Sequence, residues 1–227
     1  RRSLLNMKSI IQGQRSLAFW LSQQIDVSLN HSNEKVRKSA EDIVSLMTPV
    51  IKSFFTDMGT EITNEAIQVF GGYGYTKDQG IEQLYRDNRI TPIYEGTNSI
   101  QAIDLVFRKV LNNKILLNFT SMIKEEIKIN QETNELKKFS KLLNDNLKLL
   151  ENFSNLLEKM NKTNKDDVSG ACNDFLKVLG YISLAFSWFR ISKISFKKLN
   201  ENKNFYEEKI NTAKYFYDKI LPRAEMH

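Results

Sequence analysis

Residues that interrupt helices are rare in this sequence: its 227 residues include only three prolines and nine glycines. Proline and glycine are the strongest local breakers of regular structure, so their scarcity favours long helices over a fold rich in short strands. Hydrophobic residues make up 41% of the chain, which is enough for a buried core and argues against wholesale disorder. We therefore expect an all-α fold, built as an antiparallel, up-down helical bundle.

The first half of the chain carries apolar residues at helical spacing. The pattern predicts helices over residues 3–30, 33–58, 61–70 and 81–87, and a further helix capped by Thr97 or Asn98. The first helix has an apolar stripe that consists of Leu4, Met7, Ile11, Ala18, Leu21 and Ile25. Pro49 predicts a kink or a break in the second helix, and Gly59 predicts its end, so that Thr60 would cap the third.

The composition changes after Leu111, where Lys, Asn, Glu and Leu become dominant. Narrow apolar seams at helical spacing then predict two long helices, and a last helix covers residues 205–221. The seams consist of Leu136, Phe139, Leu143, Leu147, Leu150, Phe153, Leu157 and Met160 in one helix, and of Val168, Ala171, Phe175, Leu179, Ile182, Phe186 and Phe189 in the other. We therefore divide the chain into a helical bundle over residues 1–111 and an additional helical extension over residues 112–227.

The composition argues against several classes of site. Cys172 is the single cysteine, so it is expected to be a buried small hydrophobe, and with His31 and His227 as the two histidines no metal site is expected. The net charge of +6 is dispersed rather than gathered in a basic block, so nucleic-acid binding is not expected. The most apolar run, residues 178–189, is shorter than the ~20 residues of a membrane span. We expect a cytoplasmic protein that does not bind membranes, and a fragment of a longer one, because no initiator methionine is present.

A glycine-rich segment, Gly71-Gly72-Tyr73-Gly74, follows the third predicted helix. It lacks the spacing of a dinucleotide-binding fingerprint and follows a helix rather than a strand, so it is neither a Rossmann turn nor a P-loop. Two interpretations remain. Either the segment is a tight turn that ends a helix, which its spacing alone favours, or its glycines let the backbone approach a phosphate or a ring closely.

Glu95 lies between Tyr94 and Gly96, just before a predicted helix. Most glutamates are solvated surface groups, but burial by Ile93 and Tyr94 would suit this carboxylate to act as a general base. No second carboxylate lies close to it in the sequence, so a carboxylate pair of the glycosidase type is not indicated. Glu95 is therefore a candidate base that works alone.

Several ordered motifs carry a resemblance to a known family. They are QVFGGYGY at residues 68–75, LYRD at 84–87 and IYEGT at 93–97, accompanied by MKS at 7–9 and RSL at 15–17. In order and spacing they resemble the C-terminal helical domain of the acyl-CoA dehydrogenases. The extension, with Gly180-Tyr181 and AFSW at 185–188, resembles the additional C-terminal region of the large bacterial subfamily that includes 3-methylmercaptopropionyl-CoA dehydrogenase.

The resemblance implies an FAD-dependent enzyme that desaturates an acyl-CoA thioester to a trans-2-enoyl-CoA. Glu95 matches the catalytic base that removes the Cα proton, while a hydride passes from Cβ to flavin N5. The backbone N–H of the same residue would help to polarise the thioester carbonyl. Tyr94 and Gly96 match substrate-binding positions, with Tyr94 lining the acyl pocket.

The resemblance also implies cofactor contacts and partners. Gln68, Gly71 and Gly72 match positions that approach the FAD of a neighbouring subunit, so a homodimer or homotetramer is expected. Thr97 matches a position near the flavin, and Ser99 stands where many relatives carry a flavin-contacting glutamine. An electron-transferring flavoprotein is the expected electron acceptor.

Members of the family also have an N-terminal helical domain and a middle β-domain, which build most of the FAD and CoA site and are absent from this sequence. We therefore expect the isolated chain to bind FAD weakly or not at all and to lack dehydrogenase activity. Two alternatives remain open. One is a non-catalytic helical module for oligomerisation or scaffolding, and the other is a nucleic-acid-associated relative, which the dispersed charge disfavours.

Overall fold

The structure is a computed structural model, and it describes residues 1–111, 115–130 and 133–227. Its elements are, in chain order, α1 (Arg2–Asn30), α2 (Glu34–Phe70), α3 (Gly72–Tyr75), η1 (Lys77–Gln79), α4 (Ile81–Asn88), α5 (Asn98–Asp104), η2 (Leu105–Val110), α6 (Ile115–Ile129), α7 (Asn134–Asn161), α8 (Lys165–Lys197), α9 (Lys203–Tyr215), η3 (Phe216–Ile220) and η4 (Leu221–Met226). The segments η1 and η4 are 3-10 helices, and η2 and η3 are π-helical. Every regular element in the described ranges is helical, which confirms the all-α prediction.

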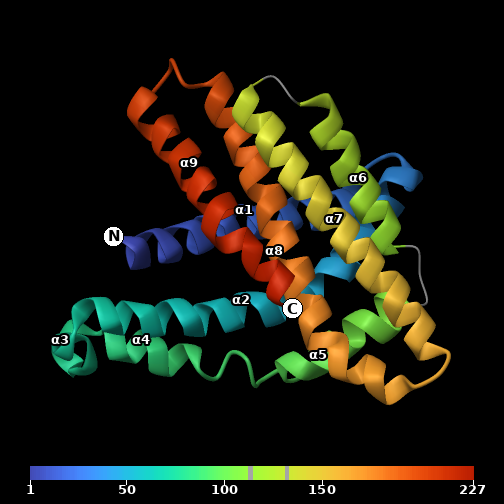
Figure 1. The fold of residues 1–227 in the computed structure, drawn as a ribbon, viewed down its shortest axis with the longest axis horizontal. Coiled ribbons are helices and arrows are strands. Elements are labelled where there is room, and N and C mark those ends of the chain that lie inside the picture. The colour runs from blue at the N-terminus through green and yellow to red at the C-terminus, as the bar shows by residue number, and fades with distance from the viewer. Residues whose placement is uncertain (112–114, 131–132) are drawn as a thin grey trace.

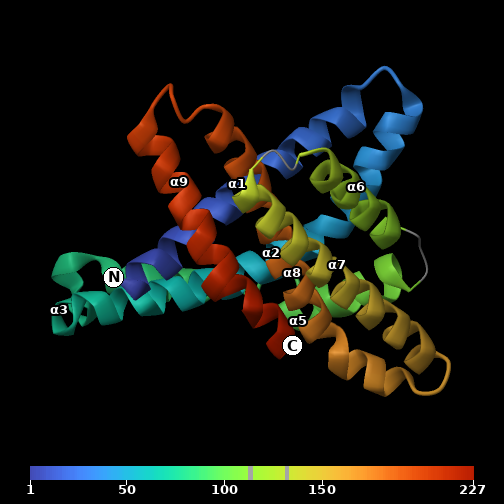
Figure 2. The same ribbon diagram turned by 45° about the horizontal axis from the view of Figure 1, so that its top comes forward.

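The helix α8 is the central element of the fold (Figure 1). It packs against α1, α2, α5, α7 and α9. Figures 1 and 2 show α6 and α7 on one side of α8 and α9 on the other, while α1 and α2 cross behind it. The extension therefore does not trail from the first half of the chain but packs onto it.

Two glycines bring the halves of the chain into close contact. A Cβ at Gly180 of α8 would lie 2.4 Å from the ring of Phe54 in α2, so only glycine allows this crossing. A Cβ at Gly13 of α1 would lie 2.9 Å from the Trp188 indole, whose Nε1 donates to the Ser9 carbonyl over 3.0 Å. One hydrophobic core runs through α1, α2, α7 and α8. The division into residues 1–111 and 112–227 stays a prediction, and its boundary falls at residues 112–114, outside the described ones.

The apolar run of residues 178–189 lies in the middle of α8 and is buried on every side. A helix that is apolar all round belongs in a protein core or in a membrane. Here the neighbouring helices of the bundle cover it. Among the described residues, no helix combines the length and the apolar character that crossing a membrane requires.

A break at Pro49 and a helix end at Gly59 are both wrong, because α2 continues through these residues to Phe70, while the kink that was the alternative at Pro49 stays a prediction. A proline inside a helix loses one backbone hydrogen bond and crowds the preceding turn. Burial of Leu46, Met47, Val50 and Phe54 on the same helix offsets that cost. Gly59 serves packing instead of termination, since a Cβ there would lie 2.6 Å from the Asn88 Oδ1. Thr60 therefore lies inside a helix and does not cap one.

The apolar stripe predicted for the first helix is confirmed at Leu21 and is otherwise wrong. The buried face of α1 consists of Asn6, Ser9, Ile10, Gly13, Gln14, Leu17 and Leu21. Leu4, Ile11 and Ile25 are exposed. The close approach of Trp188 at Gly13 sets this face, so the small residues of α1 point inward and several large ones do not.

The seams predicted for the two long helices of the extension are confirmed. In α7 the seam residues are buried, except for Phe153 and Met160, which are partly buried against the core. In α8 all seam residues are buried apart from the partly buried Ala171. The predicted last helix corresponds to α9, which begins at Lys203 and continues into η3 and η4.

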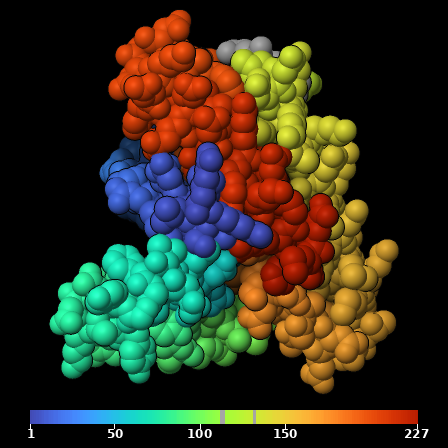
Figure 3. All heavy atoms as spheres, turned by 60° about the vertical axis from the view of Figure 1, so that its left-hand side comes forward, coloured from blue at the N-terminus to red at the C-terminus, as the bar shows by residue number. Residues whose placement is uncertain are grey.

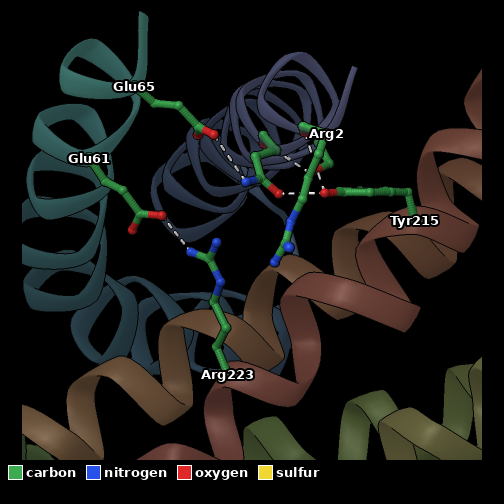
Figure 4. Close-up of polar contacts among 7 residues, drawn as sticks. Arg2, Glu61, Glu65, Tyr215 and Arg223 are labelled. Atoms are coloured by element: carbon green, nitrogen blue, oxygen red, sulfur yellow. Dashed lines mark hydrogen bonds and ion pairs between the residues drawn. The ribbon is translucent and has the colours of Figure 1, made fainter. Parts of the chain in front are cut away.

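The second half of α2, with α3 and α4, projects from the bundle as a lobe (Figure 3). Polar contacts fasten this lobe to the rest of the chain (Figure 4). Arg223 of η4 forms an ion pair with Glu61 of α2. Glu65 accepts a hydrogen bond from the Asn6 amide over 3.2 Å, and Asn6 accepts one from the Tyr215 hydroxyl over 2.6 Å. The start of α1 and the end of the chain thus hold the lobe in place.

Candidate active site

Glu95 lies in a tight turn between α4 and α5. The Tyr94 N–H donates to the Ile90 carbonyl over 3.2 Å, and the Asn98 N–H donates back to the Pro92 carbonyl over 3.0 Å, so the chain reverses within a few residues. Thr97 caps α5, as predicted, by accepting a hydrogen bond from the Ile100 N–H at its side-chain oxygen. We call residues 92–97 the Glu95 turn.

The backbone of the Glu95 turn is in an unusual conformation. Gly96 has a φ of 81°, and Glu95 has a φ of 55°, which makes it the only non-glycine residue with a positive φ in the described parts of the chain. A left-handed conformation costs an ordinary L-residue roughly 1–2 kcal/mol. Residues held in such conformations cluster at functional sites, where the surrounding structure enforces them.

Two asparagines fasten the ends of the turn to α2. At the end of α4, the Asn88 amide donates to the Thr60 hydroxyl over 2.8 Å and to the Thr56 carbonyl over 3.3 Å. At the start of α5, the Asn98 amide donates to Asp57 Oδ1 over 2.7 Å and to the Thr56 hydroxyl over 3.0 Å. Both ends of the segment that carries Glu95 are therefore hydrogen-bonded to adjacent turns of α2.

Two further side chains hold the carbonyl groups of the turn itself. The Lys52 ammonium donates to the Gly96 carbonyl over 2.7 Å, and the Gln101 amide donates to the Glu95 carbonyl over 3.0 Å. Within the described residues, neither the Glu95 N–H nor its carboxylate has a hydrogen-bond or ion-pair partner. The turn therefore presents one backbone donor and one carboxylate that remain available to a ligand.

The expectation that Ile93 and Tyr94 bury Glu95 is wrong for this chain. Ile93 and Tyr94 are each 47% exposed, and Glu95 is exposed as well. Two apolar residues of α5 are also exposed, Ile100 by 56% and Ile103 by 38%. Any apolar surroundings of the carboxylate must therefore come from groups outside the described chain.

The residues next to Glu95 that are predicted to contact substrate or flavin already make contacts within the chain. Tyr94 lies with its ring centroid 5.9 Å from the Lys52 ammonium. Ser99 accepts a hydrogen bond from the Asn173 amide of α8 over 3.4 Å, so the extension reaches the start of α5. Gly96, with its positive φ, needs to be glycine, and its carbonyl is already bound by Lys52.

The predicted glycine segment lies far from Glu95. Gly71, with φ 62° and ψ −146°, ends α2 as the helix-terminating interpretation requires, and no atom lies within 4 Å of a Cβ built on Gly71 or Gly72. Gln68 is exposed on the last turn of α2. It follows Lys52 by sixteen residues of one helix, which at about 1.5 Å per residue is about 24 Å. The structure therefore does not bring the two sets of predicted site residues together.

The side chains that hold the turn could not be identified from the sequence. The residues concerned all lie outside the IYEGT motif at residues 93–97: Lys52, Asp57, Asn88 and Gln101. One signal was present: Lys52 and Asp57 are charged residues close to an apolar stripe of α2, and both are partly buried. Their partners lie more than forty residues away in Lys52–Gly96 and Asp57–Asn98, which no local pattern reveals.

The remaining candidate groups do not form a second site. Cys172 is buried in α8, as predicted, and its thiol donates to the Val168 carbonyl over 3.2 Å. Burial raises the pKa of the Cys172 thiol to about 11, so it stays protonated at neutral pH. His227 contacts Asp174 over 2.9 Å. In the described ranges, no cluster of histidine, cysteine and carboxylate side chains could hold a metal ion.

Comparison with protein families assigns almost all of the chain. Residues 1–110 match the family described as acyl-CoA dehydrogenase, C-terminal domain, and residues 119–227 match the one described as acetyl-CoA dehydrogenase C-terminal like. Together the two matches leave only residues 111–118 uncovered.

Two curated relatives illustrate the similarity. The 3-methylmercaptopropionyl-CoA dehydrogenase of Ruegeria pomeroyi is 40% identical over 113 residues, which is 50% of this chain and 19% of the relative. The broad-specificity linear acyl-CoA dehydrogenase FadE5 of Mycobacterium tuberculosis is 28% identical over 98% of this chain and 39% of the relative. The chain thus spans between about a fifth and two fifths of the length of these relatives.

Solved structures share the fold. An acyl-CoA dehydrogenase from Bacillus anthracis, complexed with FAD, superposes with a TM-score of 0.75 at 20% identity, over 100% of this chain and 40% of the other. ACDH-11 from Caenorhabditis elegans, in complex with C11-CoA, superposes with a TM-score of 0.74 at 22% identity, over 94% of this chain and 35% of the other. Motifs, family matches and fold agree, and the chain belongs to the acyl-CoA dehydrogenase family as its C-terminal helical region.

Proposed function

We propose that this chain supplies the catalytic base of an FAD-dependent acyl-CoA dehydrogenase, which converts an acyl-CoA to a trans-2-enoyl-CoA. Glu95 is the base. The observation that carries the proposal is its conformation: a carboxylate without a partner in the described chain, on a left-handed residue whose turn is held from α2 and α5. The names of the relatives, which are dehydrogenases of acyl-CoA thioesters, support the same chemistry.

The Glu95 turn performs two tasks in this reaction. Its carboxylate takes the proton from Cα of the thioester, and the electron pair of that C–H bond becomes the second bond between Cα and Cβ. FAD, when bound, accepts the hydride that leaves Cβ. The Glu95 N–H donates to the thioester oxygen, where negative charge develops as the proton leaves. Both groups belong to one residue, so the fixed turn sets their relative geometry.

The residues that would contact FAD fall into two groups on this chain. Thr97 and Ser99 lie beside Glu95 at the start of α5, and Gln68, Gly71 and Gly72 lie at the far end of α2. The backbone at Gly71 and Gly72 has open space where a Cβ would be, which suits close approach of a ring or a pyrophosphate. The two groups lie on different elements, one at the start of α5 and the other at the far end of α2, which fits contacts to two different FAD molecules and hence a homo-oligomer. An electron-transferring flavoprotein is the proposed acceptor of the electrons.

Substitution of the base tests the proposal. In the full-length protein, Glu95→Gln is expected to lower kcat by about 10²–10⁴-fold, because an amide cannot accept the Cα proton, while the FAD content stays unchanged. Turnover with a panel of acyl-CoA thioesters and flavin absorbance measure the two effects. The matched control is Glu82→Gln, which alters a partly buried glutamate that pairs with the exposed Arg86 on α4. Near-normal turnover of Glu95→Gln would favour a scaffolding role for this region.

The isolated chain of residues 1–227 is expected to be inactive and to bind FAD weakly or not at all. Ile93, Tyr94 and Ile100 are exposed in it, so it does not enclose the carboxylate. Flavin absorbance of the purified chain measures this directly. Flavin that remains bound through purification would contradict the expectation.

A further inference from the structure

We propose that Lys52 is a positioning residue for Glu95: it acts through the Gly96 carbonyl and the Asn98 side chain to hold the Glu95 turn in its working conformation. The inference rests on the proposed function of Glu95 as the base. Lys52 lies in the middle of α2, on the part of the helix that faces the turn, and it is not expected to touch the substrate.

The Lys52 ammonium is bound on more than one side. It donates to the Gly96 carbonyl over 2.7 Å and to Asn98 Oδ1 over 2.9 Å, and the ring of Tyr94 lies 5.9 Å away. An ammonium group has three donors, and hydrogen bonds from a charged donor are shorter and stronger than neutral ones. One side chain thereby links the residues on both sides of Glu95 to α2.

Asn98 extends the effect of Lys52 to the start of α5. Its Oδ1 accepts from the Lys52 ammonium, and its Nδ2 donates to Asp57 Oδ1 over 2.7 Å and to the Ser53 carbonyl over 3.1 Å. These contacts fix the orientation of the Asn98 side-chain amide, because the Lys52 ammonium binds its oxygen and the Asp57 carboxylate binds its NH₂ group. Asn98 is the first residue of α5, so this fixes the point from which the turn departs.

The position of these contacts explains why the turn needs them. Glu95 is held in a left-handed conformation that an ordinary residue disfavours. Gln101 binds the carbonyl of Glu95, and Lys52 binds the next carbonyl along the chain. Without Lys52 the turn can relax toward an ordinary backbone conformation, and Glu95 moves with it. A shift of about 1 Å in a reacting group can cost about 100-fold in rate.

The test measures turnover and turn mobility separately. In the full-length protein, Lys52→Met removes the donors and keeps most of the stem; kcat is expected to fall about 10–100-fold, with a much smaller change in KM for the acyl-CoA. Amide hydrogen exchange of residues 94–98 is expected to become faster. Lys38→Met is the matched control, because Lys38 is an exposed lysine near the start of α2 that pairs with Glu41 and Asp42. It should match the wild type in both measurements.

A double substitution distinguishes positioning from general destabilisation. If Lys52 acts through Asn98, Lys52→Met in an Asn98→Ala background lowers kcat much less than it does alone, because the linked contacts are already lost. The inference would be overturned if the fall in kcat of the double variant equals the product of the falls in the two single variants. It would also be overturned if amide exchange at residues 94–98 is unchanged in Lys52→Met. Should Lys52→Met not fold, Lys52→Arg is measured in its place. Its displaced donors should give a smaller fall in kcat and faster exchange, and wild-type values of both would overturn the inference.

Failure of the proposed function remains distinguishable from failure of this inference. If Glu95→Gln leaves turnover intact, Glu95 is not the base. The exchange of residues 94–98 in Lys52→Met then still decides whether Lys52 holds the turn. If Glu95→Gln abolishes turnover and Lys52→Met changes neither kcat nor exchange, the base is correct and the positioning role is wrong.

Discussion

The Glu95 turn and the glycine segment at the end of α2 differ in what holds them. The glycine segment is stabilised locally: Gly71 donates to the Gln68 carbonyl, and Gly74 donates to the Gly71 carbonyl, over 3.1 and 3.0 Å. The Glu95 turn depends on Lys52, forty-four residues from the carbonyl that it binds. One segment is shaped by its own residues, and the other by a helix earlier in the chain.

The difference matches the tasks that we propose for the two segments. A backbone surface that approaches a cofactor needs small residues and open space, which local sequence can provide. A base must keep one position relative to its substrate, which requires side chains from rigid neighbouring elements. Substitution of Gly96 in the Glu95 turn, and of Gly71 and Gly72 in the glycine segment, can test this contrast.

The largest effect is expected at the turn itself. Gly96→Ala places a Cβ on a residue with a φ of 81°, which costs roughly 1–2 kcal/mol, and relief of that strain displaces the adjacent Glu95. In the full-length protein kcat is expected to fall about 100-fold. Turnover and thermal unfolding, measured together, separate displacement of the base from loss of fold. Wild-type turnover would mean that the conformation of the turn is not essential.

A smaller effect is expected at the glycine segment, where two neighbours form a matched pair. Gly71→Ala is expected to destabilise the protein by roughly 1–3 kcal/mol, because its φ of 62° with ψ −146° is a region essentially restricted to glycine. Gly72→Ala has open space and no positive φ, so it should be neutral or stabilise α3 by roughly 0.5–1 kcal/mol. Thermal unfolding measures both, and FAD content shows whether a methyl group alone blocks the cofactor. Equal destabilisation by the two substitutions would contradict the local account.

The smallest effect is expected in the core beneath the turn. Cys172 precedes Asn173, whose amide reaches Ser99 at the start of α5. Its thiol is buried, and burial raises its pKa to about 11, so a thiol reagent reaches it only when α8 opens. Labelling of the Cys172 peptide, followed by mass spectrometry at pH 8, is expected to change by no more than about twofold in Gly96→Ala, because α8 is held by its own core. Strong acceleration would mean that strain in the turn spreads into α8.

The Cys172 thiol is expected to make the stability of the protein fall as the pH rises above 9. Its folded pKa lies above the usual value of 9.0, so its contribution to stability is fully present below pH 9 and is lost as the pH rises toward about 11. Labelling of the folded protein should therefore remain slow up to pH 9 and accelerate above it.

Much of the fold could be predicted because its determinants are periodic. The seams of α7 and α8 repeat at helical spacing, and both helices bury them as predicted. Thr97 could be identified as a cap, and Gly71 as the end of a helix, because each acts on residues within a few positions of itself. Glu95 could be singled out by its resemblance to a family, while its isolation from other carboxylates followed from the residues alone.

The errors have a common physical origin. Pro49 and Gly59 are helix breakers by intrinsic preference, but contacts formed elsewhere in the chain decided their conformation. The buried face of α1 followed from the space that Gly13 leaves for Trp188. In each case, packing energy between distant segments exceeded a local preference worth about 1–3 kcal/mol.

The sequence by itself determined the helical class, the cap at Thr97 and the seams of the extension, since each depends on neighbours along the chain. The candidate base came from the resemblance of the motif around Glu95 to a family. Only the tertiary structure decided that α2 is continuous, that α8 joins the two halves, and that Lys52, Asn88 and Asn98 hold the turn. These features depend on directional hydrogen bonds and close packing between residues far apart in the chain, and their geometry exists only once the helices have packed.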